Sequence, residues 1–199
     1  MTPGPFRLVE GGMAKDGGKG KGPTRGAQLR FLDAGLDVLG REGHAGLKLA
    51  TVCKAAGATT GSFYHAFPSW PEFTTALIGY WREEKSDLLI RRAAEISDPV
   101  ERLTALIDIG LQLPHDSEAA IRVWAAHDPD VRAVQTGTDE ERRRIIADAY
   151  FEATGDRDLA ERNATVAMYL LVGYESGTYR DRDALGWAFR SFMEKGLPT

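Results

Sequence analysis

The stretch "AGATTGSFYHAF", residues 56–67, decides the fold of this chain. Gly57 can end one short helix, and Thr59 or Thr60 can cap the next. Pro68 closes that second helix, because proline disfavours helix in the residue before it. Two short helices joined by a glycine-containing turn, after a longer helix, predict a helix-turn-helix.

The segments before and after this stretch also favour helix. Residues 24–43 carry leucines at helical spacing, and Thr24 and Gly43 can cap and terminate that helix. Residues 47–57 form a short amphipathic pattern. A longer helical pattern begins near Ser69, an N-cap candidate, and continues to about Ile96.

The rest of the chain repeats this character. Further helices are predicted over 100–111, 117–127, 128–155, 157–177 and 182–195, with Gly137 as a point where the third of these could break. Strand signals are scarce, since alternating runs of Val, Ile and Thr are missing. The expected fold class is therefore all-α.

Composition limits the setting in which the chain works. Its 199 residues are 43% hydrophobic, enough for a real core. No run reaches the roughly 18 apolar residues of a membrane helix, and the Gly- and Lys-rich N-terminus does not resemble a secretory signal. The single cysteine, Cys53, excludes an internal disulfide. Together these features predict a cytoplasmic protein without membrane contact.

Charge is distributed unevenly along the chain. Residues 1–30 carry six basic and two acidic side chains, whereas the whole chain has a net charge of −4. Residues 1–23 are rich in Gly, Pro and Lys, a composition that predicts a disordered basic arm. Such an arm on an acidic body indicates an anionic partner at one end, and a merely solvated tail is the alternative.

Catalytic and metal-binding patterns are missing from the sequence. The four histidines are scattered, and no pair has the spacing of two metal ligands on one helical face. Cys53 falls on an apolar stripe, as a buried inert cysteine would. The run "DEERRR", residues 139–144, places Asp139 before Arg143 and Glu140 before Arg144, a pattern typical of a solvated helix face. We therefore predict no catalytic residues, no metal and no cofactor.

The opening stretch is similar to the helix-turn-helix signature of the tetracycline-repressor (TetR) family. Ala56, Gly57, Gly61, Tyr64 and Phe67 match the family pattern, and three neighbours are conservative replacements. The resemblance covers about 50 residues at the level of motifs.

Two positions depart from the family pattern. The family's histidine falls on Ala66, and the lysine usual at the start of the next helix falls on Trp70. Both family residues typically support contact with the DNA backbone, so the departures leave open either compensation by His65 and the basic arm or a weaker grip on phosphate.

The resemblance implies a homodimeric transcription regulator, generally a repressor, that binds a palindromic operator. It implies a three-helix DNA-binding head over 24–68 and a helical effector-binding and dimerisation body over 69–199, after the arm. Phosphate contacts are then expected from Thr24, Arg25, Lys48, Thr59, Tyr64 and His65. Base contacts are expected from Thr60, Gly61 and Ser62.

The resemblance also implies an effector pocket in the body. Aromatic residues with polar tips and polar neighbours on the body helices are the candidates: Tyr80, Trp81, Gln112, Trp124, His127 and Tyr150. Trp124 and His127 share a helix face and form the best pair. The expected effector is apolar or aromatic with one polar group.

The last two helical patterns are apolar on more than one side, which indicates more than one packing neighbour. We expect them to form the dimer interface through Val166, Leu170, Tyr174, Leu185, Phe189 and Phe192. A fully buried helix in a monomer is the alternative.

Two other classes of protein are alternatives to a ligand-responsive regulator. A small helical enzyme would need a convergent set of polar residues, which the sequence lacks. A helical DNA-binding or partner-binding protein without a small-molecule switch stays open because of Ala66 and Trp70. The effector, the operator and the sign of regulation do not follow from the sequence.

Overall fold

The computed structural model of the chain describes residues 24–84 and 88–197. The expected basic arm, residues 1–23, lies outside this part of the chain. Every regular element in the described part is a helix, which confirms the all-α fold. The first five helices are α1 (Arg25–Gly46), α2 (Leu49–Ala55), α3 (Thr60–Ala66), α4 (Trp70–Arg82) and α5 (Leu88–Ala94). The next five are α6 (Pro99–Gln112), α7 (His115–Ala125), α8 (Pro129–Thr154), α9 (Arg157–Ser176) and α10 (Arg182–Gly196).

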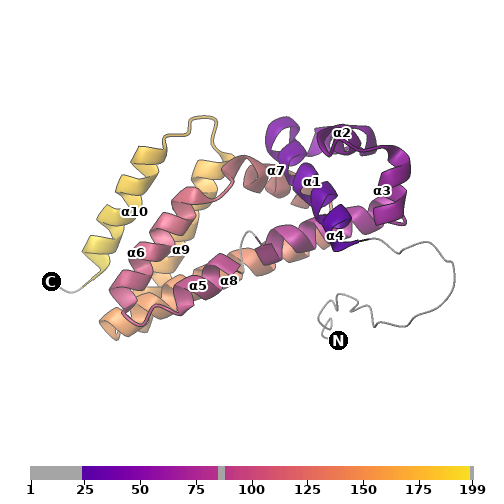
Figure 1. Ribbon diagram of the computed structural model, residues 1–199. Helices are drawn as coiled ribbons and strands as arrows, with labels where there is room; N and C mark the ends of the chain where they lie inside the picture. Colours follow the sequence, from indigo (N-terminus) through magenta and orange to yellow (C-terminus); the bar gives the residue numbers. More distant parts are fainter. Residues whose placement is uncertain (1–23, 85–87, 198–199) are drawn as a thin grey trace, which may run out of the picture.

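The helices form an elongated molecule with a head at one end (Figure 1). Helices α1–α3 make the head, and α6, α9 and α10 lie at the opposite end. The long α8 packs on α9, α6 and α7, and α7 packs on α1. Helix α4 leads from the head into the body and contacts both α1 and α8. Consequently α4 and α7 connect the head with the rest of the chain.

Side-chain caps start most helices where the sequence predicts. The hydroxyl of Thr24 accepts from the Ala27 amide, and that of Ser69 accepts from the Glu72 amide. Aspartates cap the four helices that follow a short loop, namely Asp98, Asp128, Asp156 and Asp181. Each cap satisfies amides that have no partner within the helix.

Three helix boundaries differ from the expectation. Helix α4 ends at Arg82 and α5 begins at Leu88, where one pattern to about Ile96 was expected; residues 85–87 lie outside the described part. Helix α8 continues through Gly137 without a break. Gly43 has φ +68°, which ends the regular part of α1, yet one more turn follows to Gly46.

The largest hydrophobic core joins the head to the body. It contains Phe31 of α1, Phe63 of α3 and Phe73 of α4 together with Ile121 of α7, all of them fully buried. Helices α1 and α4 approach closely at Gly35, where a Cβ atom would lie 2.9 Å from the Phe73 ring. Because α1, α3, α4 and α7 share this core, a shift of α4 or α7 requires side chains of the head to repack.

Among the described residues, no helix combines the length and the hydropathy needed to cross a membrane. The same residues contain no cluster of three or more His, Cys, Asp or Glu side chains suited to a metal ion.

Candidate DNA-binding surface and effector cavity

The turn between α2 and α3 has the geometry of a helix-turn-helix. Gly57 adopts φ +59°, a conformation that other residues rarely accept, and the Ala58 amide donates to the Cys53 carbonyl at 2.9 Å. Thr59 then caps α3, because its hydroxyl accepts from the Ser62 amide at 3.1 Å. The two hydroxyls of Thr59 and Ser62 also bond each other at 3.0 Å. These contacts fix the direction in which α3 leaves the turn.

One face of α3 is anchored in the core. Phe63 and Ala66 are at most 1% exposed, and the ring of Phe63 packs edge-on against Phe31 and Phe73 at centroid distances of 5.4 and 5.2 Å. Tyr64 is 51% exposed on the other side, beside the exposed His65. The anchored face holds α3 in place while its opposite face remains accessible.

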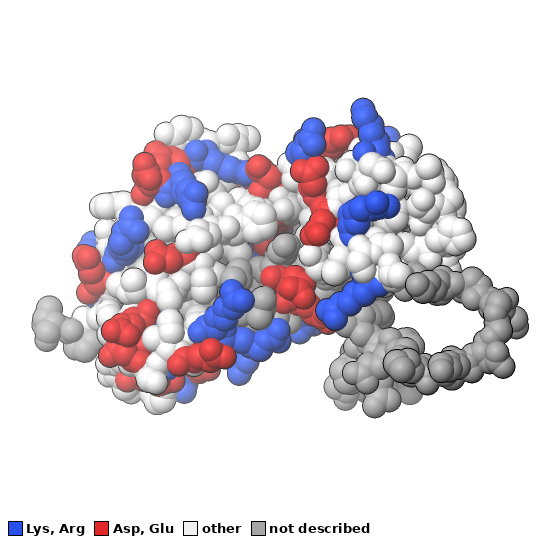
Figure 2. Space-filling model, in the orientation of Figure 1, with Lys and Arg blue, Asp and Glu red and all other residues white. Residues whose placement is uncertain are grey.

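The residues expected at DNA lie on the surface of the head. Eight of the nine are exposed and Ser62 is half-buried. Residues 47–68 include Lys48 and Lys54 but no acidic side chain. The head end of the molecule shows large uncharged areas with basic side chains, whereas both signs alternate over the body (Figure 2). The accessible part of the head therefore suits a polyanion.

The two departures from the family pattern have a structural explanation. Ala66 is 1% exposed, and its carbonyl accepts from the Gln28 side chain at 3.0 Å. Trp70 packs against Phe63 and Phe73, with ring centroids 5.9 and 5.0 Å apart. Both residues thus stabilise the core of the head.

An apolar cavity of about 80 Å³ lies between α6, α8, α9 and α10. Its wall includes Ile107 of α6, Ile146 of α8, Met168 of α9 and Phe189 of α10. Apart from Tyr150 and Arg142, the lining residues are aliphatic, Phe, Met, Ala or Gly. A mostly apolar hollow with few polar groups is the usual form of a small-molecule site.

Of the six residues expected at an effector, only Tyr150 lines this cavity. Trp124 stacks on His44 at 5.1 Å and donates to Asp128, so it packs against α1 instead. His127 is exposed at the end of α7. The expected pair of Trp124 and His127 therefore lies on the face of α7 that turns towards the head.

The other three candidates also lie away from the cavity. Gln112 is exposed at the end of α6. The Tyr80 hydroxyl donates to Asp33 at 2.7 Å, which ties α4 to α1. Trp81 is fully buried in the large core. The sequence pattern placed these residues on body helices, but it did not show which neighbouring helix each side chain contacts.

Arg142 is the cavity residue that sequence reasoning missed. It lies one turn before Ile145 and Ile146 on the same inward face of α8. That spacing is the sequence pattern that could have indicated its position. Its side chain is 7% exposed, and its guanidinium donates to both carboxylate oxygens of the fully buried Glu118, at 3.0 and 3.2 Å. The expectation that residues 139–144 form a solvated face is therefore wrong for Arg142.

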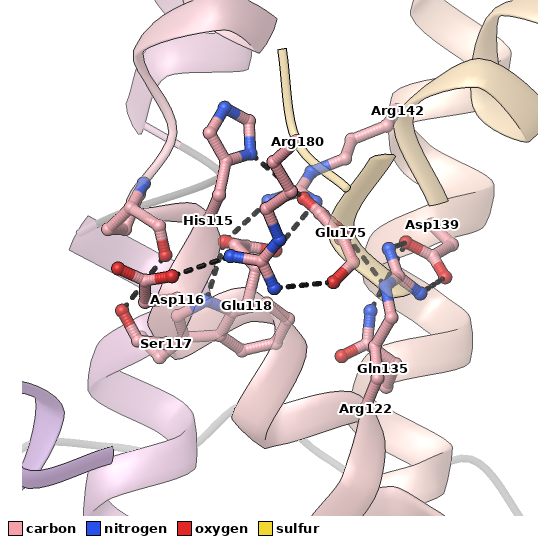
Figure 3. Close-up of polar contacts among 12 residues, drawn as sticks. His115, Asp116, Ser117, Glu118, Arg122, Gln135, Asp139, Arg142, Glu175 and Arg180 are labelled. Atoms are coloured by element: carbon pink, nitrogen blue, oxygen red, sulfur yellow. Dashed lines mark hydrogen bonds and ion pairs between the residues drawn. The ribbon is translucent and has the colours of Figure 1, made fainter. Parts of the chain in front are cut away.

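A buried polar network extends from this pair (Figure 3). Arg122 of α7 bonds both oxygens of Asp139, at 2.7 and 3.0 Å, and donates to Glu175 at 2.8 Å. Asp139 thus also faces inward, a second correction to the solvated-face expectation. Burial alone lowers the pKa of the Arg142 guanidinium, but Glu118 and the nearby carboxylates raise it above its ordinary value. Arg142 consequently keeps its charge.

Helices α9 and α10 expose two large aromatic side chains. Tyr169 and Trp187 are each 70% exposed. Of the residues expected at a dimer interface, Leu185 and Phe189 are buried within the chain. The other four are half-buried, namely Val166, Leu170, Tyr174 and Phe192. The structure therefore places the exposed aromatic surface at positions that the sequence pattern did not select.

Comparison with known proteins agrees with this architecture. Residues 31–70 match the family model described as bacterial regulatory proteins, tetR family. The chain is 26% identical over 154 residues to the HTH-type transcriptional regulator CymR of Pseudomonas putida, covering 75% of this chain and 76% of that protein.

Solved structures share the fold. A TetR transcription regulator from Haloarcula marismortui has a TM-score of 0.73 at 17% identity, covering 88% of this chain and all of that one. A putative transcriptional regulator from Saccharomonospora viridis, in complex with choline, has a TM-score of 0.72 at 16% identity, covering 87% and 98%.

A helix-turn-helix head on an all-helical body is the architecture of the DNA-binding transcriptional regulators to which the chain is similar. The matched segment contains α2, the Gly57 turn and α3, the elements on which that assignment depends. The head is thus similar to bacterial regulatory proteins of the TetR family, and the chain shares its fold with TetR regulators of known structure.

Proposed function

We propose that this protein is a ligand-responsive repressor that binds a palindromic operator as a homodimer and releases it when a small apolar or aromatic effector occupies the cavity. Residues 24–68 would bind DNA and residues 69–199 would hold the effector and the second copy. The regulator would act in the cytoplasm. The choline found with a structural neighbour supports the idea that this fold accommodates small molecules.

The observation that supports a sensor role most strongly is the connection between cavity and head. Arg142 lines the cavity and bonds Glu118, which accepts a hydrogen bond from Trp81 of α4 at 2.8 Å. Helix α4 packs against α1 through Gly35 and Phe73. A ligand packed beside Arg142 would therefore shift the Arg142–Glu118–Trp81 contact and α4 with it, and so change the spacing of two heads.

Dimeric heads would meet half-sites about 34–36 Å apart or a multiple of that distance. The exposed aromatic residues Tyr169 and Trp187 are the best candidates for contact with a second copy, because solvent-exposed aromatics of this size are enriched at interfaces. The half-buried Val166 and Leu170 on α9 would extend the same contact.

A gel-shift experiment tests the proposal. The probe is the DNA upstream of the protein's own gene, with and without an extract of the source cells. Specific binding that the extract releases supports the repressor with an effector. Specific binding that no extract releases favours a regulator without a switch, and no shift at any salt concentration contradicts DNA binding altogether.

A further inference from the structure

The cavity wall carries one charged side chain among the described residues, that of Arg142. This guanidinium already forms a bidentate ion pair with Glu118, whose side chain is fully buried. A buried charge without a partner is costly, so this pairing is retained unless a ligand replaces it fully. Arg142 is thus poorly suited to neutralise an additional anion.

The surroundings of Arg142 add negative charge to its side of the cavity. The network contains the carboxylates of Glu118, Asp139 and Glu175 against the guanidiniums of Arg122 and Arg142. His115 lies 3.5 Å from Glu175 and brings the sum to zero only when it is protonated. Arg180, at the edge, is paired with Asp116. With its carboxylates ionised, this network therefore has no surplus of positive charge for an anionic ligand.

A cationic ligand finds no counter-charge either. The described lining residues include no carboxylate, and the carboxylates behind Arg142 are already bonded to arginines. Ammonium groups would have to leave water without compensation, at a cost that excludes tight binding. Charge of either sign is therefore disfavoured inside the cavity.

Tyr150 is the uncharged polar side chain among the described lining residues of the cavity. It is 3% exposed and lines the cavity. Burial raises the pKa of Tyr150 to about 12, so the hydroxyl stays protonated at neutral pH. A phenol can donate or accept one hydrogen bond, so Tyr150 is the uncharged side chain of the described cavity wall that can bond a polar group of a ligand.

We infer that the effector is an electrically neutral, mainly apolar molecule with one hydroxyl or carbonyl group, which bonds the Tyr150 hydroxyl. This inference rests on the proposed function, because it takes the cavity as the effector site. The cavity of about 80 Å³ is smaller than an engineered cavity of about 150 Å³ that binds benzene, so a molecule with a single ring would fit only if the wall side chains moved. Met168 and Met193 line the wall and can adapt to shape.

Three probes with the same carbon skeleton test the inference: benzyl alcohol, benzoate and benzylammonium. Their binding to the full chain is measured at pH 7 by calorimetry and by the shift in melting temperature. Benzyl alcohol is expected to bind at least about tenfold more tightly than either ion, which corresponds to about 1.4 kcal/mol. Equal or tighter binding of benzoate or benzylammonium overturns the inference, and so does the absence of binding by all three.

Two variants place the binding in the cavity. Tyr150→Phe removes only the hydroxyl and is expected to weaken benzyl alcohol about fivefold, as loss of one hydrogen bond does. The matched control is Tyr179→Phe, since Tyr179 is 83% exposed and outside the cavity wall, so that the change should leave affinity unchanged. Ala167→Leu fills the cavity and should abolish binding. Unchanged affinity in Tyr150→Phe or in Ala167→Leu contradicts the assigned site.

The same probes separate this inference from the proposed function. Benzyl alcohol that binds in the cavity without altering DNA affinity supports the inference and counts against a sensor role. Benzoate that binds there and releases DNA supports the sensor role and overturns the inference.

Discussion

The indole Nε1 of Trp81 donates a 2.8 Å hydrogen bond to Oε1 of Glu118, and both side chains are fully buried. The same carboxylate oxygen accepts from Arg142 at 3.2 Å, and the guanidinium carbon lies 5.9 Å from the Trp81 ring centroid. Three helices, α4, α7 and α8, therefore meet at one carboxylate. A ligand packed beside Arg142 would therefore act on α4, α7 and α8 through one junction without breaking its hydrogen bonds.

Trp81→Phe removes the donor and keeps an aromatic ring. We expect a loss of about 1–3 kcal/mol in the free energy of unfolding, because one oxygen of a buried carboxylate loses a partner. The coupling between cavity ligand and DNA, typically about 5–150-fold in affinity, should shrink towards unity. Denaturant unfolding and ligand-dependent gel shifts measure the two effects. Tyr179→Phe, at an 83% exposed site, is the control that should change neither.

Gly61→Ala tests how closely the backbone of α3 approaches DNA. The nearest atom to a Cβ at this position is the Thr59 hydroxyl at 3.7 Å, so the fold accepts the methyl group. Stability should rise by up to about 1 kcal/mol, as expected for alanine in a helix, while operator affinity falls. Gly137→Ala on α8 is the matched control, with open space around its Cβ. Unchanged operator binding in Gly61→Ala would rule out close approach.

Tyr64 and Thr60 are expected to play different parts at DNA. Tyr64→Phe should weaken binding to all sequences similarly, because a phosphate contact carries no sequence information. Thr60→Ala should instead change the preferred bases, as a selection from random DNA would reveal. Equal losses on specific and random DNA for both variants would contradict this division.

Trp187→Glu tests the aromatic surface of α9 and α10. A carboxylate introduced into an apolar interface is strongly unfavourable, so the dimer should dissociate at micromolar concentration. Sedimentation velocity measures the change. Tyr179→Glu serves as control, because Tyr179 is 83% exposed between the two helices. If the Trp187→Glu variant remains dimeric, Trp187 does not lie in the dimer interface.

His44 makes stability depend on pH. Burial lowers its pKa, with a smaller opposing effect from Asp128 and a further lowering from His127. The unfolded state therefore takes up the proton first, near the ordinary pKa of about 6.5, and the free energy of unfolding falls as the pH drops below that value. Urea unfolding of wild type and His44→Gln at pH 7.5 and 5.5 measures this. The variant should lose less stability on acidification; an identical loss would assign the effect to other groups.

The head was predictable because its signals are local. Gly57 takes the left-handed conformation that the turn needs, Thr59 caps α3, and Phe63 faces the core as its spacing indicated. Each of these depends on residues within a few positions along the chain. The effector cavity was less predictable, because only Tyr150 among six candidates lines it.

The sequence by itself determined the helical class, the start of most helices and the helix-turn-helix, since caps, glycines and apolar periodicity act over single turns. Only the tertiary structure decided which face of each body helix meets which neighbour. Arg142 follows three acidic residues and precedes two arginines, so its local sequence predicts exposure to solvent. It is buried because Glu118, 24 residues earlier, supplies the opposite charge inside the core.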